Sequence, residues 1–152
     1  MAFIAQDTYL TDYARAFPGM LLDGNTQSRP TGIIQDAAGI AFGKAAFSST
    51  VSTRSITGTP GTKFKGIVVA DIGVVPGLSG TADTHGQYGT CTLCDMGDIA
   101  VIASGAVTKD APVYVTSAGA FTATATSNTA IPATFMDAAA SGAVVGIRVV
   151  QQ

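Results

Sequence analysis

The sequence predicts an all-β protein, a β-sandwich or a jelly-roll-like small barrel, with an extended N-terminal arm. All ten acidic residues are Asp and none is Glu; Asp favours turns and caps, whereas Glu favours helices. Thr and Val are abundant and Gly numbers 18, a composition typical of strands joined by turns. Short apolar stretches also follow one another closely, as they do in sandwiches and small barrels.

The first part of the chain differs from the rest. Its apolar residues follow no clean period, and Pro18-Gly19, Asp23-Gly24 and Arg29-Pro30 are breaks that disfavour a continuous helix or a central strand. We therefore expect residues 1–35 to form an arm and residues 36–152 to form the β-domain. An ordinary first strand followed by a loop is the alternative interpretation of the same pattern.

Strands are expected in quick succession after the arm. The connections between them are too short for parallel crossovers, which favours antiparallel pairing. Residues 73–97 form a long Gly-rich excursion that interrupts the series. In the hairpin at 112–126, Val113 and Val115 should face the core and Phe121 should alternate with Thr122. The expected strands are Ile40–Phe47, Arg54–Gly58, Phe64–Asp71, Gln87–Leu93, Asp98–Ser104, Pro112–Ser117, Phe121–Thr126, Ala133–Met136 and Val144–Val150.

The composition indicates which classes of protein this chain can be expected to belong to. Charged residues make up only 12% of the chain against 47% hydrophobic residues, which suits a subunit of an assembly better than a freely diffusing domain. The net charge is −2 and the basic residues are scattered along the sequence, so nucleic-acid binding is not expected. The start of the chain lacks the pattern of a signal peptide, and no apolar run is long enough to span a membrane.

Catalysis has little support in the sequence. The chain has a single His, His85, and we expect it in a Gly- and Thr-rich loop without a nucleophile elbow nearby. Asp95 and Asp98 could act as an acid–base pair, but they fall at a loop-to-strand junction where Asp usually caps a turn. We expect that this protein is not an enzyme and binds no cofactor.

The pair Cys91 and Cys94 is the only metal-like pattern. Together with His85 these residues are weak candidates for metal ligands, because the second Cys pair of a typical zinc site is missing. A redox role would need a helix start after a strand, which the pattern does not predict. Free structural thiols are therefore expected, with a metal site and a disulfide or redox pair as the alternatives.

Several segments, taken in order, resemble the structural cement proteins of tailed phages. The match covers nearly the whole chain, and it departs from the family pattern mainly at Thr81–Met96. No single motif is specific, so the resemblance rests on their order. The similar segments are Tyr13-x-x-x-Phe17-x-Gly19-Met20-Leu21, Ile40-x-Phe42-Gly43-Lys44, Phe64-x-Gly66-Ile67-x-Val69, Gly97-Asp98-x-x-Val101, Asp110-x-Pro112-Val113-Tyr114-Val115, Gly119-x-Phe121-Thr122 and Ile131-Pro132-Ala133-x-Phe135-Met136.

The resemblance implies a non-enzymatic virion protein. Such a protein would lie on the outer surface of the capsid, cement neighbouring major capsid protein subunits and reach the particle from the host cytoplasm during assembly. Its partners would be the major capsid protein and itself, as a homodimer or homotrimer. An all-β phage adhesin or receptor-binding module is the alternative. Aromatic and Met side chains are enriched at interface cores, so the expected interface anchors are Tyr9, Tyr13, Phe17, Met20 and Leu21, although these could also pack into the protein's own core.

Overall fold

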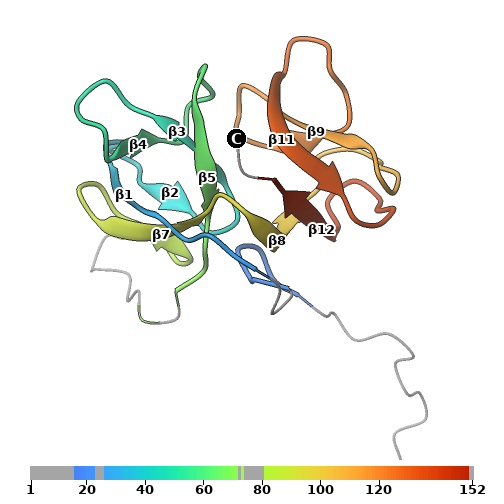
Figure 1. The fold of residues 1–152 in the computed structure, drawn as a ribbon, viewed down its shortest axis with the longest axis horizontal. Helices are drawn as coiled ribbons and strands as arrows, with labels where there is room; N and C mark the ends of the chain where they lie inside the picture. Colours follow the sequence, from blue (N-terminus) through green and yellow to red (C-terminus); the bar gives the residue numbers. More distant parts are fainter. Residues whose placement is uncertain (1–15, 23–25, 72, 74–80, 151–152) are drawn as a thin grey trace, which may run out of the picture.

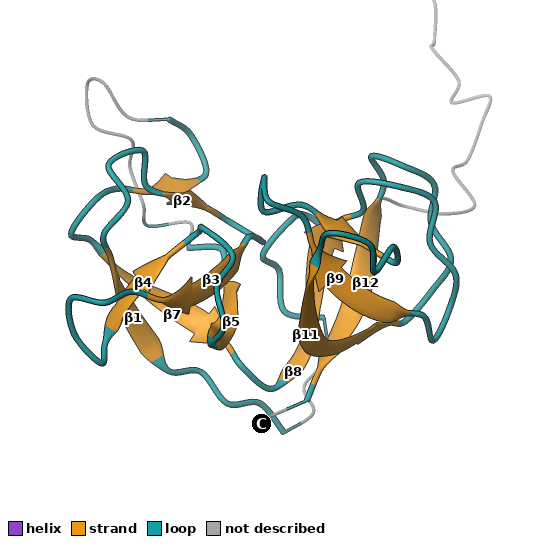
Figure 2. Cartoon of the chain, turned by 90° about the horizontal axis from the view of Figure 1, so that it is seen from above, coloured by secondary structure: helices purple, strands orange, loops and turns teal. Residues whose placement is uncertain are grey.

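The computed structural model describes residues 16–22, 26–71, 73 and 81–150. Within these residues the chain forms strands and turns, without a helix, in two lobes that lie side by side (Figures 1 and 2). The strands are β1 (Thr31–Ile34), β2 (Ile40–Ala41), β3 (Ala45–Ser48), β4 (Ser55–Thr57), β5 (Phe64–Val68), β6 (Thr84–His85), β7 (Thr90–Cys94), β8 (Gly97–Ile102), β9 (Pro112–Val115), β10 (Phe121–Thr122), β11 (Thr129–Phe135) and β12 (Val144–Val149).

The N-terminal lobe is a closed barrel with the strand order β1-β4-β3-β5-β7. All its neighbouring strands are antiparallel except β1 and β4, which are parallel. The short strands β2 and β6 pair beside it. A cluster of buried apolar residues belongs to this lobe: Ile34, Ile40, Ala46, Ile56, Val68, Cys91 and Leu93.

The C-terminal lobe is a five-stranded antiparallel sheet in the order β10-β9-β11-β12-β8. Its longest ladder joins β8 to β12, from Gly97–Val149 to Ile102–Val144. A parallel bridge between Ala103 and Phe121 links the chain after β8 to β10, the strand at the other end of the sheet order. The sheet therefore curls round almost to closure.

The two lobes share one hydrophobic core. Ala45 and Phe47 of β3 belong to the cluster that contains the buried side of the C-terminal sheet, whereas Ala46 between them belongs to the barrel cluster. In β5, Ile67 belongs to the cluster shared with the C-terminal sheet and Val68 belongs to the barrel cluster. Because both faces are buried at Ala45–Phe47 of β3 and at Ile67 and Val68 of β5, these stretches are unbroken apolar runs instead of alternating ones.

The prediction of an all-β fold with a small barrel is confirmed, as are the buried faces of Val113 and Val115. The expected strand Ile40–Phe47 is wrong as one element, because a turn at Gly43 (φ 69°) divides it into β2 and β3. The second hairpin strand ends at Thr122. That residue is buried, contrary to the expected alternation. A further correction concerns His85, which lies in β6 and not in a loop.

The boundary of the expected arm also needs correction. Residues 31–34, assigned to the arm, form β1, which pairs with both β4 and β7 and so belongs to the barrel. Gly32 fits tightly there, since a Cβ atom on it would lie 2.8 Å from Cδ1 of Ile56. Residues 1–15 lie outside the described residues, so their expected role as an arm stays a prediction.

Candidate functional site

Residues 17–22 connect the two lobes through backbone hydrogen bonds. The Gly19 N–H donates to the carbonyl of Ala100 in the C-terminal lobe at 2.8 Å, and the Ala70 N–H of the barrel donates to the Gly19 carbonyl at 2.9 Å. Leu21 forms an antiparallel bridge with Ile99, so the segment runs beside β8. We refer to residues 17–22 as the strap.

The strap sits on the barrel through two glycines. A Cβ atom on Gly19 would lie 2.9 Å from the Gly43 nitrogen, and one on Gly43 would lie 2.7 Å from the Gly19 nitrogen. Both residues also have positive φ values, 82° and 69°, which side-chain-bearing residues rarely adopt. The close approach of the two backbones therefore requires glycine at both positions.

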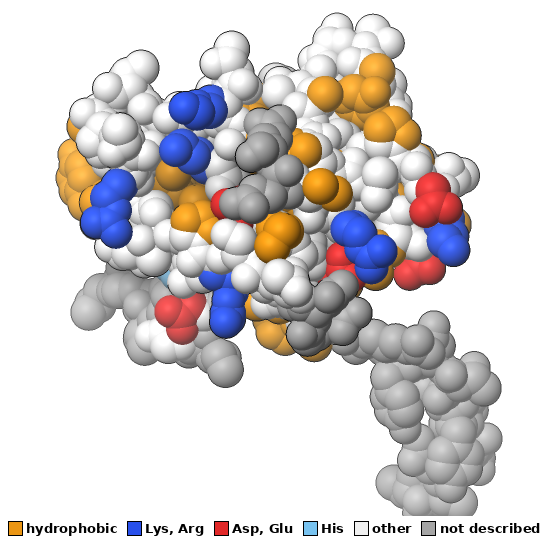
Figure 3. All heavy atoms as spheres, in the orientation of Figure 1, with side chains coloured by type: hydrophobic (Ala, Val, Ile, Leu, Met, Phe, Trp, Pro, Cys, Tyr) orange, Lys and Arg blue, Asp and Glu red, His pale blue; other side chains and the backbone are white. Residues whose placement is uncertain are grey.

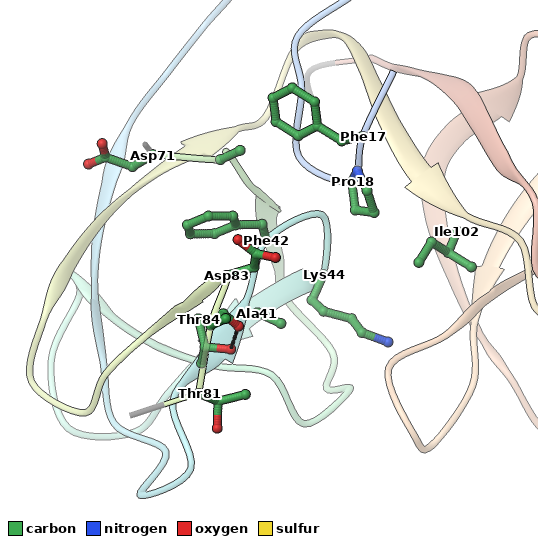
Figure 4. A pocket seen from close by; sticks show the side chains of 12 residues that line it. Phe17, Pro18, Ala41, Phe42, Lys44, Asp71, Thr81, Asp83, Thr84 and Ile102 are labelled. Atoms are coloured by element: carbon green, nitrogen blue, oxygen red, sulfur yellow. Dashed lines mark hydrogen bonds between the residues drawn. The ribbon is translucent and has the colours of Figure 1, made fainter. Parts of the chain in front are cut away.

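A pocket of about 540 Å³ opens where the strap meets the barrel (Figure 4). We call it the seam pocket. Figure 4 shows Phe17 and Pro18 of the strap near Phe42 of the barrel, with Ile102 on the side of the C-terminal lobe. The complete lining is Phe17, Pro18, Ala41, Phe42, Lys44, Ala70, Asp71, Thr81, Ala82, Asp83, Thr84 and Ile102.

Large apolar side chains are exposed at and beside this pocket. Phe17 is 55% exposed and Ile102 is 46% exposed. Val144, 40% exposed, is the direct cross-strand partner of Ile102, so the two side chains lie on the same face of the sheet. Phe17, Ile102 and Val144 thus form an apolar surface, which we call the seam patch.

The structure separates the expected interface anchors. Phe17 is at the seam patch, whereas Leu21 is half-buried and packs against the core that the lobes share. Met20 is half-buried in the strap, and Tyr9 and Tyr13 lie outside the described residues. The sequence analysis missed Ile102 and Val144. The alternation of β12 could have indicated Val144, whereas β8 is buried from Gly97 to Val101 and gives no such signal for Ile102.

The two cysteines are free thiols and belong to different buried clusters. Cys91 lies in the barrel cluster, whereas Cys94 lies in the core shared by the lobes, so the disulfide alternative is wrong. Burial raises the pKa of Cys91 from 9.0 to about 11. Burial, together with the nearby charge of Asp95, raises the pKa of Cys94 to the same value. These thiols stay protonated near neutral pH and are therefore poor nucleophiles.

The weak metal candidates are not brought together. His85 is 5% exposed and its ring packs edge-on against Phe42 at 5.1 Å, while its Nε2 has no hydrogen-bond partner. In the described part of the chain, no group of three or more His, Cys, Asp or Glu side chains is arranged to hold a metal ion. The same residues include no helix that is long and apolar enough to cross a membrane.

The acid–base candidates are engaged in the fold. Asp98 is 2% exposed and accepts hydrogen bonds at 2.8 Å from both Nε and Nη2 of Arg148, its cross-strand partner on β12. This bidentate pair fixes the register of β8 against β12. Asp95 is half-buried in the connection between the lobes, and its Oδ1 has no hydrogen-bond partner. The two carboxylates thus have different surroundings and do not form a matched pair.

Comparison with known proteins gives three findings. The family model described as structural cement protein (E217 gp24/Pam3 gp6) matches residues 5–150. A chain of the capsid of Myoviridae phage XM1 is similar in fold, with a TM-score of 0.67, 19% identity and 97% of each chain covered. The head fibre gp8.5 N base of bacteriophage phi29 is more distant, with a TM-score of 0.44, 15% identity, and 82% of this chain and 95% of that chain covered.

No curated protein matches the sequence. The family model nevertheless spans nearly all of the 152 residues, including the strap and both lobes. This chain therefore belongs to the structural cement proteins of phages.

Proposed function

We propose that this protein binds the outer surface of a phage capsid and holds neighbouring major capsid protein subunits together, without catalysing a reaction. Membership of the structural cement family supports this function. The structural observation that carries it is the seam patch, where Phe17, Ile102 and Val144 expose apolar side chains next to the seam pocket. Exposed apolar side chains gathered beside a pocket are typical of a protein–protein contact.

The backbone that carries the seam patch is hydrogen-bonded to the rest of the fold. Phe17 belongs to the strap, whose backbone hydrogen bonds reach both lobes, while Ile102 and Val144 stand on the longest ladder of the C-terminal sheet. A surface that is already ordered loses little conformational entropy on binding. A protein that binds the closed shell in preference to loose subunits stabilises the shell by mass action.

The N-terminal residues would extend this contact. Phe17 follows Tyr9 and Tyr13 closely in the sequence. We expect these tyrosines to act as additional anchors on the capsid or on a neighbouring copy. The proposal includes self-association as a homodimer or homotrimer, because a charged fraction of only 12% suits a chain with several protein neighbours.

Binding to shells assembled without this protein tests the proposal. The full chain should co-sediment with such shells at a fixed saturating ratio, and saturated shells should withstand a higher temperature before they disrupt. An unrelated protein of similar size and charge serves as the control. Failure to bind, or binding that leaves the disruption temperature unchanged, would contradict the proposed function. Binding to host cells instead of shells would support the adhesin alternative.

A further inference from the structure

One end of the barrel carries a cluster of basic residues. Strands β1, β4 and β5 begin at this end and β7 ends there, and a groove of about 490 Å³ opens between them. Arg29, Arg54 and Lys65 line the groove, together with the apolar side chains of Ile56 and Leu93. A smaller adjoining groove is lined by Lys63 and again by Lys65. We call this surface the basic end.

The positive charges of the basic end are poorly neutralised. Among the residues that the structure describes, no acidic residue lines the larger groove, and Asp95 lines the smaller one. Arg54 donates to Oγ1 of Thr31 and Lys65 to the carbonyl of Thr53, which are both uncharged acceptors at 3.4 Å. Basic residues that are scattered in the sequence thus gather in space, and Figure 3 shows Lys and Arg side chains (blue) on the barrel lobe.

The basic end and the seam pocket lie at opposite ends of the barrel. Strand β5 joins them: Lys65 at its start lines the groove, whereas Ala70 and Asp71, just after its end, line the seam pocket. Six residue steps lead from Lys65 to Asp71, a span of at most roughly 20 Å at about 3.3 Å per residue. Two different protein neighbours can therefore occupy the two surfaces at once.

We propose that the basic end is a second contact surface, which binds a carboxylate-rich segment of a neighbouring capsid subunit. The inference rests on the proposed function and adds the second surface that bridging requires. Arg54 and Arg29 can each hold a carboxylate through two N–H groups, and Lys65 adds a further charge.

Charge complementarity favours an acidic protein over a nucleic acid. Duplex DNA presents one negative charge about every 1.7 Å, so it requires an extended row of cations. Here four cations occupy one end of a small barrel, and the chain as a whole carries a net charge of −2. The remaining surface would repel a long polyanion, whereas a short acidic segment can be neutralised at the basic end alone.

Charge reversal tests this inference with the full-length protein. The variants are Arg54→Glu and Lys65→Glu, singly and together, with Arg54→Gln and Lys65→Gln as neutral versions in case reversal impairs folding. Lys109→Glu is the matched control, because Lys109 is exposed in the C-terminal lobe and does not line either groove of the basic end. Binding to shells assembled without the protein is measured at low and high salt. A 20-base-pair duplex is the second probe.

The double charge reversal should weaken shell binding by at least about tenfold and reduce its dependence on salt, while Lys109→Glu binds like the wild type. Unchanged shell binding by the double variant would overturn the inference. A loss confined to duplex binding would also overturn it and would assign the basic end to a nucleic acid. A loss of self-association before any shell is added would overturn it too and would assign the basic end to a second copy. A wild-type chain that fails to bind shells would instead contradict the proposed function, and the second contact with it.

Discussion

Replacing Phe17 with Ala should weaken binding to the capsid without unfolding the protein. Phe17 is 55% exposed, and a Phe side chain offers about 200 Å² in all, so about 110 Å² remains accessible. Burial of that area in an interface is worth about 3 kcal/mol at about 25 cal/mol per Å². Full burial is an upper limit, so the dissociation constant should rise by about tenfold to a hundredfold.

Co-sedimentation with shells assembled without the protein measures this change. Tyr88→Ala is the matched control: Tyr88 is 71% exposed, it is also aromatic, and it does not line the seam pocket. The melting temperatures of both variants should stay close to that of the wild type, because neither side chain belongs to a buried core cluster. Equal shell affinity of the Phe17 variant and the wild type would refute the seam patch as a contact. A similar loss in both variants would show that the effect is not specific to the patch.

Three further predictions concern stability. Gly43→Ala should lower the free energy of unfolding in urea by about 2–3 kcal/mol, because the φ of Gly43 is 69° and the new Cβ would press against the strap. A decrease of less than about 0.5 kcal/mol would contradict that packing. The raised pKa values of Cys91 and Cys94 mean that the folded protein keeps protons which the unfolded chain releases. The free energy of unfolding should therefore fall as the pH rises from 9 towards 11, by about 2–3 kcal/mol per thiol at most. A variant with both cysteines replaced by Ala should lack this part of the decline. Val113→Asp should unfold the protein, because Val113 is 1% exposed in the shared core, whereas Thr124→Lys should be tolerated because Thr124 is exposed. Circular dichroism of both variants checks this prediction. Equal tolerance of the two substitutions would refute the assignment of their faces.

The sequence predicted the strands whose own pattern is strong. Strands β9 and β12 alternate between buried and more exposed residues, and β5 ends in the buried apolar residues Ile67 and Val68. Strand β1 was missed because Arg29-Pro30 reads as a break, although the strand starts just after it and is held by partners far along the chain. The division at Gly43 was hidden because an apolar run with one Gly is compatible with a single strand.

The candidate contact surfaces depend on closure of the barrel, so most of their residues could not be predicted from local sequence patterns. Phe17 was selected as an aromatic residue in the expected arm, but its place beside Ile102 follows from the strap, which crosses from one lobe to the other. The basic end combines Arg29, Arg54 and Lys65, which come from three separate parts of the barrel. Scattered charges give no local signal of such a cluster, because the strand order and register decide which of them meet.

The position of β5 between the two ends of the barrel has a mechanical consequence. A pull applied between the basic end and the seam pocket runs along the axis of β5 and not across it. The hydrogen bonds that join β5 to β3 and β7 would then share the load in shear, and separating the strands would require breaking them together. Neighbouring β3 and β5 also anchor the C-terminal lobe through the shared core, so the two lobes would resist such tension as one unit.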